Sequence, residues 1–73
     1  MVRRDALINK IRAIGYAYKD TKKRISLWRK TGGTHFISLP HTELLEDSYV
    51  MSVLRQAGES EAAIRSFIGS HSV

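Results

Sequence analysis

Seventy-three residues without a cysteine are expected to make one small domain around a single core. The missing cysteines exclude a disulfide framework and a thiolate zinc site, and they suit a reducing compartment such as a bacterial cytoplasm. The formal net charge of +5 is unevenly divided, because residues 1–30 hold ten Lys and Arg against two acids and residues 31–73 hold two against five. This asymmetry favours an anionic partner.

The N-terminal segment shows neither a secretory signal nor a membrane span. Charged residues interrupt its apolar positions, so it contains no continuous apolar stretch of the required length. We therefore expect a cytoplasmic protein that does not insert into membranes. A single domain over residues 1–69 and a flexible tail over residues 70–73 are the expected organisation.

The first predicted element is a helix over residues 3–14. Leu7, Ile8 and Ile11 follow the spacing of one helical face, and charged residues occupy much of the remaining surface. Gly15 supplies a C-terminal stop, because glycine readily adopts the left-handed conformation that closes a helix.

Two strands are expected next, over residues 16–18 and 24–29. The first segment contains two tyrosines, which are common in strands, and apolar residues alternate with other side chains along the second segment. The alternation predicts that Ile25 and Leu27 face the core and that Trp28 is exposed on the other side.

A hairpin turn is indicated at residues 31–34, which read Thr-Gly-Gly-Thr. Paired glycines can take the positive φ angles that a tight two-residue turn requires. A third strand follows at about residues 35–39, and Pro40 ends it because proline has no amide hydrogen to donate. Residues 41–46 form a connection whose shape the sequence does not define.

The remaining chain is predicted to be helical. Asp47 or Ser48 can cap a helix whose apolar stripe recurs at i, i+3, i+4 and i+7 and ends before Gly58. The stripe consists of Val50, Val53, Leu54 and Ala57. Ser60 can cap a further short helix over residues 61–68.

The order α-β-β-β-α with an added short helix implies an α+β fold. The hairpin turn forces antiparallel pairing, so the three strands form an antiparallel sheet and the helices cover one of its faces. The other face is then open to a ligand. A free strand edge and the apolar patch around Phe67 would both permit a homodimer.

Three stretches of the sequence resemble the HicA toxin family, small proteins that cleave messenger RNA and whose fold is like that of double-stranded-RNA-binding domains. They are Ile14-Gly15-Tyr16, Ser38-Leu39-Pro40-His41 and, most specifically, Val50-Met51-Ser52-Val53-Leu54-Arg55-Gln56-Ala57-Gly58, where family members commonly read Leu-Arg-Ser-Ile-Leu-Lys-Gln-Ala-Gly. The resemblance runs without gaps from Gly15 to Gly58 and covers nearly the whole chain. It implies a dsRBD-like fold, RNA as ligand and a HicB-like antitoxin as protein partner.

In the same alignment, this sequence has no histidine at the family's catalytic position. The histidine of the family's Gly-Ser-His motif falls on Ile25, or on Ser26 if the register slips by one position. Isoleucine can neither titrate nor hydrogen-bond, and a serine hydroxyl is a poor base near neutral pH. We therefore expect that ribonuclease activity is lost or weakened.

The chain contains three histidines, one of which is a candidate replacement. His35, at the start of the third strand, is the candidate substitute base, whereas His41 is expected to hydrogen-bond in the turn after Pro40 and His71 to lie in the tail. No two of them have the i, i+4 spacing of metal ligands, so no metal site is expected. No glycine-rich phosphate loop leads from a strand into a helix, and no cofactor is expected.

The expected RNA-binding residues are mainly cations on the first helix and the first two strands. They are Arg3, Arg4, Lys19, Lys22, Lys23, Arg24, Trp28, Arg29 and Lys30. Each phosphate contact releases counterions, so binding of single-stranded or duplex RNA should be salt-sensitive. Exposed aromatic rings would add stacking on unpaired bases.

Three functions are compatible with these residues. The first is an RNA-binding domain without strong ribonuclease activity. The second is an active ribonuclease in which His35 is the base and Arg24 or Lys23 stabilises the developing charge. The third is a protein-interaction module that binds a HicB-like antitoxin or another acidic protein. A duplex-DNA binder is a further alternative, although no helix-turn-helix is recognisable.

Overall fold

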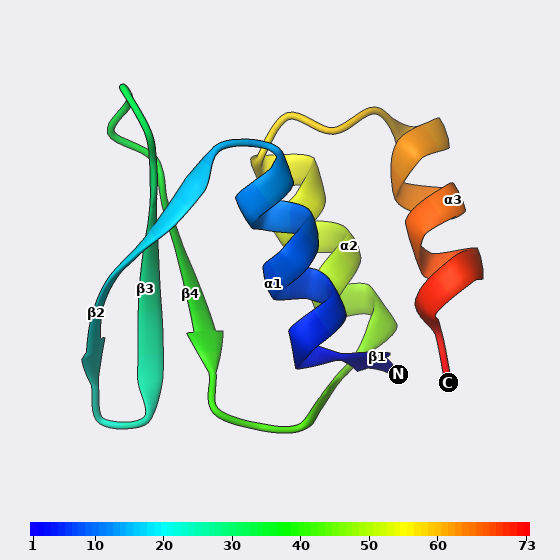
Figure 1. Ribbon diagram of the computed structural model, residues 1–73. Helices are drawn as coiled ribbons and strands as arrows, with labels where there is room; N and C mark the ends of the chain where they lie inside the picture. Colours follow the sequence, from blue (N-terminus) through cyan, green and yellow to red (C-terminus); the bar gives the residue numbers. More distant parts are fainter.

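The computed structural model describes residues 1–73 as an α+β fold with three helices and two antiparallel sheets (Figure 1). In chain order the elements are β1 (Val2–Arg3), α1 (Arg4–Ala13), β2 (Tyr16–Lys22), β3 (Ile25–Lys30), β4 (Phe36–Pro40), β5 (Leu44–Leu45), α2 (Asp47–Gln56) and α3 (Glu61–His71). Strands β2, β3 and β4 form a three-stranded sheet in that order, and β1 pairs with β5. The predicted α+β class and its three-stranded antiparallel sheet are confirmed.

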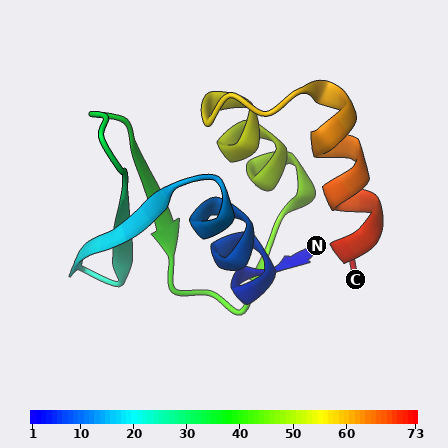
Figure 2. The same ribbon diagram turned by 45° about the horizontal axis from the view of Figure 1, so that its top comes forward.

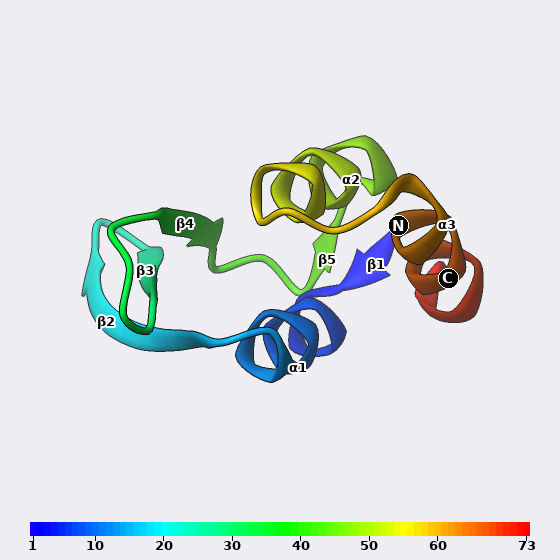
Figure 3. The same ribbon diagram turned by 90° about the horizontal axis from the view of Figure 1, so that it is seen from above.

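Helices α1 and α2 lie on the same side of the three-stranded sheet, and α3 lies beyond them (Figures 1 and 3). The sheet projects from the helical part of the molecule, so no other element covers its second face (Figure 2). Every helix and strand contributes to one buried cluster. Its members are Val2, Leu7, Ile11, Tyr16, Trp28, Ile37, Leu39, Leu45, Val50, Val53, Leu54, Ile64 and Phe67.

Helix α1 forms where the apolar spacing predicts it, with Leu7 and Ile11 fully buried. Gly15 then adopts a φ of +105°, and its N–H donates to the carbonyl oxygen of Arg12 at 3.1 Å. This left-handed residue closes the last turn, as the sequence predicts.

Helix α2 buries Val50, Val53 and Leu54 of its predicted apolar stripe, and α3 buries Ile64 and Phe67. The N-cap of α2 is Glu46, which makes no capping hydrogen bond through its side chain, and not Asp47 or Ser48. The cap of α3 is as predicted, because the Ser60 hydroxyl oxygen accepts the N–H of Ala63 at 3.1 Å. No helix of the chain combines the length and the apolar character that crossing a bilayer requires.

Strand β3 buries the face opposite to the one expected. Ser26 and Trp28 are 1% and 5% exposed, whereas Ile25 is 45% exposed. The register explains this, since Ser26 lies opposite Leu39 and Trp28 opposite Ile37, both of which are core residues of β4. A tryptophan side chain removes roughly 150–250 Å² from water, so the face that carries it is the more favourable one to bury.

The buried Ser26 is compensated by hydrogen bonds. Its hydroxyl oxygen accepts Arg4 Nη2–H at 2.9 Å and Trp28 Nε1–H at 3.0 Å, and its O–H donates to the Leu39 carbonyl oxygen at 3.3 Å. Arg4 Nε–H also donates to the Pro40 carbonyl oxygen at 2.9 Å. Arg4 therefore ties the start of α1 to β3 and β4.

The two hairpin turns of the sheet differ from the expected one. The β3–β4 loop lies at the predicted place but is longer than two residues, and of its two glycines only Gly32 has a positive φ, +77°. The β2–β3 turn consists of Lys23 and Arg24, with φ values of +52° and +61°. Positive φ angles at both turn positions are typical of Asn-Gly sequences. The Lys-Arg sequence at this position therefore does not predict the β2–β3 turn.

The two ends of the chain contact each other. Helix α3 continues to His71, three residues beyond its predicted end at residue 68, and Ser72 forms a bridge with Val2. The Val73 N–H donates to the Met1 carbonyl oxygen at 2.7 Å. Residues 70–73, which were expected to form a tail, thus complete α3 and pair with the N-terminal residues.

Candidate functional site

The uncovered face of the three-stranded sheet combines apolar and cationic side chains. Three rows of paired residues lie across it: Ala17, Arg29 and Phe36; Asp20, Leu27 and Ser38; Lys22, Ile25 and Pro40. We call this surface the open face. Ile25 and Phe36 are 45% and 40% exposed, and a hollow of about 360 Å³ lies against Lys19, Asp20, Lys22, Ile25 and Leu27. Large apolar residues that gather on an exposed surface mark a binding site.

The free end of the β2–β3 hairpin, which we call the basic turn, consists of Lys22, Lys23 and Arg24 (Figure 1). These side chains and that of Lys19 are exposed, and none of the four forms an ion pair. A non-glycine residue in a left-handed conformation costs about 1–3 kcal/mol and persists only where its surroundings hold it. Here the Arg24 carbonyl oxygen accepts the His41 N–H at 3.0 Å.

Arg29 and Phe36 form a pair on the open face. The Arg29 guanidinium carbon lies 5.9 Å from the centroid of the Phe36 ring, and Nε–H donates to the Gly33 carbonyl oxygen at 3.1 Å. The guanidinium is thus held beside the ring in a cation–π arrangement. An exposed ring and a fixed guanidinium together offer a surface on which an unpaired base can stack.

Three residues that were predicted to bind RNA are buried or already engaged within the protein. Trp28 is buried, so its ring offers no surface for stacking. The Arg4 guanidinium is bound to β3 and β4 as described above. Lys30 Nζ donates to the Ile14 carbonyl oxygen and lies 5.3 Å from the centroid of the Tyr16 ring. Arg4 and Lys30 form these contacts because a half-buried cation needs hydrogen-bond acceptors in place of water.

The remaining predicted cations lie on the β2–β3 hairpin, except for Arg3 of β1. Arg3 is exposed and forms a loose ion pair with Glu43, with 3.6 Å between Nη1 and Oε1. Lys10 of α1 is paired with Glu59 at 2.8 Å. The largest group of cations without such partners therefore follows the β2–β3 hairpin.

His35, the predicted substitute base, is not free. Its Nδ1 lies 2.6 Å from the Tyr16 hydroxyl, and the two rings meet edge to face. Burial raises the pKa of the Tyr16 phenol, so the hydroxyl stays protonated at neutral pH and can donate to Nδ1. His35 also precedes β4 at the end of the sheet opposite to the basic turn (Figure 1). The structure does not bring it together with Lys23 or Arg24.

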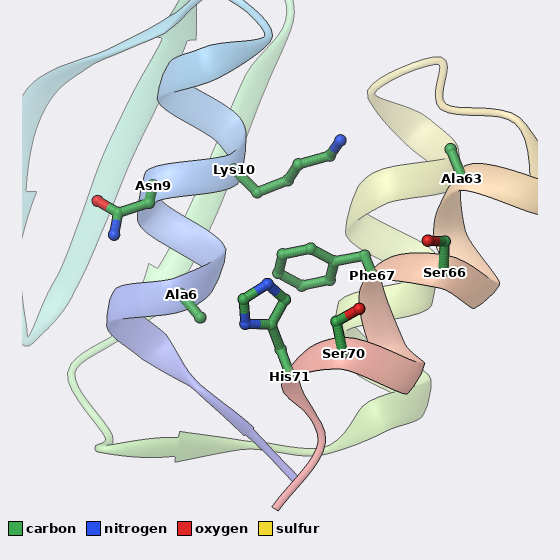
Figure 4. Close-up of a pocket in the computed structure, with 8 residues that line it drawn as sticks. All are labelled: Ala6, Asn9, Lys10, Ala63, Ser66, Phe67, Ser70 and His71. Carbon is green, nitrogen blue, oxygen red and sulfur yellow. The ribbon is translucent and has the colours of Figure 1, made fainter.

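The largest hollow of the molecule lies between α1 and α3 and measures about 650 Å³ (Figure 4). It is lined by Ala6, Asn9, Lys10, Ala63, Ser66, Phe67, Ser70 and His71. Lys10 is engaged with Glu59, and the His71 ring packs on the Phe67 ring with centroids 4.5 Å apart. Because its charged groups are already partnered, this hollow has less binding chemistry to offer than the open face.

Sequence reasoning missed that His41 lies beside the basic turn. The contact joins residues 24 and 41 through backbone atoms, and no periodicity along the chain can signal such a pairing. The only hint was the position of His41 directly after Pro40, at the end of a strand that must run back toward the β2–β3 turn.

The sequence matches no protein-family model and no curated protein. The resemblance to HicA toxins therefore stays a prediction, and the functional assignment depends on the geometry of the open face and the basic turn. No group of three or more His, Cys, Asp or Glu side chains is placed to hold a metal ion.

Proposed function

We propose that this protein binds single-stranded RNA through the open face and the basic turn. The observation that supports the proposal most directly is the row of cations without ion-pair partners along one hairpin. These cations, Lys19, Lys22, Lys23 and Arg24, border a sheet face on which the Phe36 ring is exposed. Phosphates and bases of one strand can contact the two kinds of group at the same time.

The cations and the exposed Phe36 ring together favour the binding of single-stranded RNA over duplex RNA. Cations alone would serve either form, because every phosphate contact releases counterions from both. Stacking on an exposed ring requires an unpaired base, and the Arg29 and Phe36 pair offers such a platform. A duplex would leave this part of the open face unused.

The proposed class is a HicA-like, dsRBD-like module that has lost the base at the family's catalytic position. Ile25 stands at that position and is exposed on the open face, where it can contact a base but cannot exchange a proton. Ser26, the alternative position, is buried with its hydroxyl fully engaged. Neither residue can start strand cleavage.

Fluorescence anisotropy with a labelled single-stranded RNA at several salt concentrations tests the cations. The double variant Lys22→Ala/Lys23→Ala should bind more weakly, and its log-log salt slope should be shallower by about 1.4, since each single-strand phosphate contact contributes about 0.7. Arg12→Ala/Arg65→Ala removes the same charge from exposed helix positions and should keep the wild-type slope. Equal losses in both variants would show that net charge, not the hairpin, is responsible.

The stacking contribution is tested by Phe36→Ala. Base stacking is worth roughly 1–3 kcal/mol, so affinity should fall about 5-fold to 150-fold. Leu44→Ala removes an exposed apolar side chain outside the open face and should leave affinity unchanged. If the wild-type protein does not bind RNA at low salt, the proposal is refuted. A HicB-like antitoxin or another acidic protein is then the better partner for these cations.

A further inference from the structure

Asp20 places a carboxylate on a surface where cations gather. It is the only acidic residue between Asp5 and Glu43, and it lines the hollow of the open face together with Lys19 and Lys22. Although these lysines line the same hollow, Asp20 forms no ion pair. A carboxylate repels the phosphates that lysines attract, so phosphate binding alone does not account for an acid at this position.

The carboxylate of Asp20 is held by the backbone and keeps free acceptor positions. The Thr21 N–H donates to Asp20 Oδ1 at 2.8 Å, whereas no hydrogen bond or ion pair of the structure involves Oδ2. Each oxygen of an ionised carboxylate has about two lone-pair positions, and the group can only accept hydrogen bonds. Asp20 can therefore accept hydrogen bonds from a ligand through both oxygens without releasing Thr21.

The surroundings of the carboxylate fit one nucleotide. The hollow measures about 360 Å³, which lies within the range of roughly 300–1,000 Å³ that is usual for small-ligand sites. Ile25 and Leu27 line it with apolar side chains, on which a flat ring can lie. Lys19 and Lys22 line it with ammonium groups, which can contact the phosphates on either side of a base.

Guanine is the base whose edge matches a carboxylate. Its Watson–Crick edge carries two neighbouring donors, N1–H and the N2 amino group. In adenine and cytosine the amino donor lies beside a ring nitrogen that accepts, and in uracil N3–H lies between two carbonyl oxygens. Each of these three bases therefore brings an acceptor against a group that can only accept.

We propose that the hollow of the open face selects an unpaired guanine, with Asp20 accepting hydrogen bonds from N1–H and the N2 amino group. The inference rests on the proposed RNA binding and names the base that the site prefers. Arg29 and Phe36 form the next row of the open face, two residues and roughly 7 Å farther along β3 than Leu27. The base next to the guanine can therefore stack on the Phe36 ring.

Fluorescence anisotropy with labelled oligouridylates that differ at one central nucleotide tests this selection. Wild-type protein should bind RNA with a central guanosine about 5-fold to 150-fold more tightly than RNA with a central adenosine or cytidine, which is the discrimination expected of a bidentate base contact. Central inosine lacks the N2 amino group and should give an intermediate affinity. Asp20→Asn keeps an oxygen for the Thr21 N–H and should bring the ratio of guanosine to adenosine affinity close to one.

The matched control is Asp5→Asn, which removes the same charge from an exposed position outside the open face. It should keep the wild-type ratio of affinities. The ratio is the readout because the loss of a negative charge strengthens phosphate contacts in both variants, whichever base is present.

The outcomes separate base selection from RNA binding. Wild-type protein that binds all these RNAs equally, or that prefers another base, overturns this inference and leaves the proposed RNA binding intact. A preference for guanosine that persists in Asp20→Asn also overturns it, as does inosine that binds as tightly as guanosine. Absence of RNA binding by the wild type overturns the proposed function itself. If circular dichroism shows that Asp20→Asn is unfolded, wild-type binding of inosine and 1-methylguanosine decides, because both must bind more weakly than guanosine.

Discussion

Replacing Ser26 by alanine tests the network that joins α1 to the sheet. Ser26 is the one polar residue of the buried core, and its hydroxyl contacts groups from α1, β3 and β4. The substitution hardly changes the volume of the side chain, so lost hydrogen bonds account for the effect. It leaves the buried Trp28 N–H without an acceptor and removes one of the two acceptors of the Arg4 guanidinium.

The magnitude follows from these contacts. An unsatisfied buried donor costs about 1–3 kcal/mol, and a hydrogen bond to a charged group contributes about 1.5–3 kcal/mol. Arg4 keeps its bond to the Pro40 carbonyl oxygen, and as a half-buried side chain it can recover part of the loss through water. We therefore expect Ser26→Ala to lower the free energy of unfolding by about 2–4 kcal/mol.

Urea and thermal denaturation followed by circular dichroism measure this change. In a domain of this size each kcal/mol shifts Tm by about 4–8 °C, so a fall of at least about 8 °C is expected. Ser38→Ala is the matched control, because Ser38 lies on the open face and its hydroxyl makes no hydrogen bond within the protein. Equal stabilities of the two variants would refute the network and the inward orientation of this strand face.

Three further changes test the turn, the helix end and an exposed ion pair. Lys23→Gly relieves the backbone strain of a φ of +52° and should raise the free energy of unfolding by up to about 1 kcal/mol, while it weakens RNA binding. A lower stability of this variant in urea denaturation would argue against strain at Lys23. Lys30→Met removes the cation bound to the Ile14 carbonyl oxygen and should lower stability by about 1–3 kcal/mol in thermal denaturation, whereas an unchanged Tm would contradict the contact. The hydrogen bond from Arg55 lowers the pKa of the Glu61 carboxyl below its ordinary value of 4.5, so this stabilisation is present above that pH and is lost as the pH falls through the lowered value. Glu61→Gln should therefore flatten the fall of stability with acid, and urea titrations that show the wild-type slope would contradict it.

Local signals in the sequence determined most of the elements. The apolar periods of α1 and α2, the stop at Gly15 and the cap at Ser60 each depend on residues within a few positions of one another. The charge asymmetry can also be counted in the sequence alone, and Lys22 and Lys23, which belong to the excess of cations in residues 1–30, are exposed in the structure. Such features can be predicted because neighbours along the chain supply the decisive interactions.

Tertiary structure alone decided which side chains the candidate site contains. An alternating strand has two faces, and pairing with Ile37 and Leu39 of β4 selected the one that buries Trp28 and exposes Ile25. Contacts between distant residues likewise bound the half-buried Arg4 guanidinium to β3 and β4 and set His41 against the basic turn. The sequence could not reveal these outcomes, because each depends on burial and hydrogen bonding between segments that only the folded chain brings together.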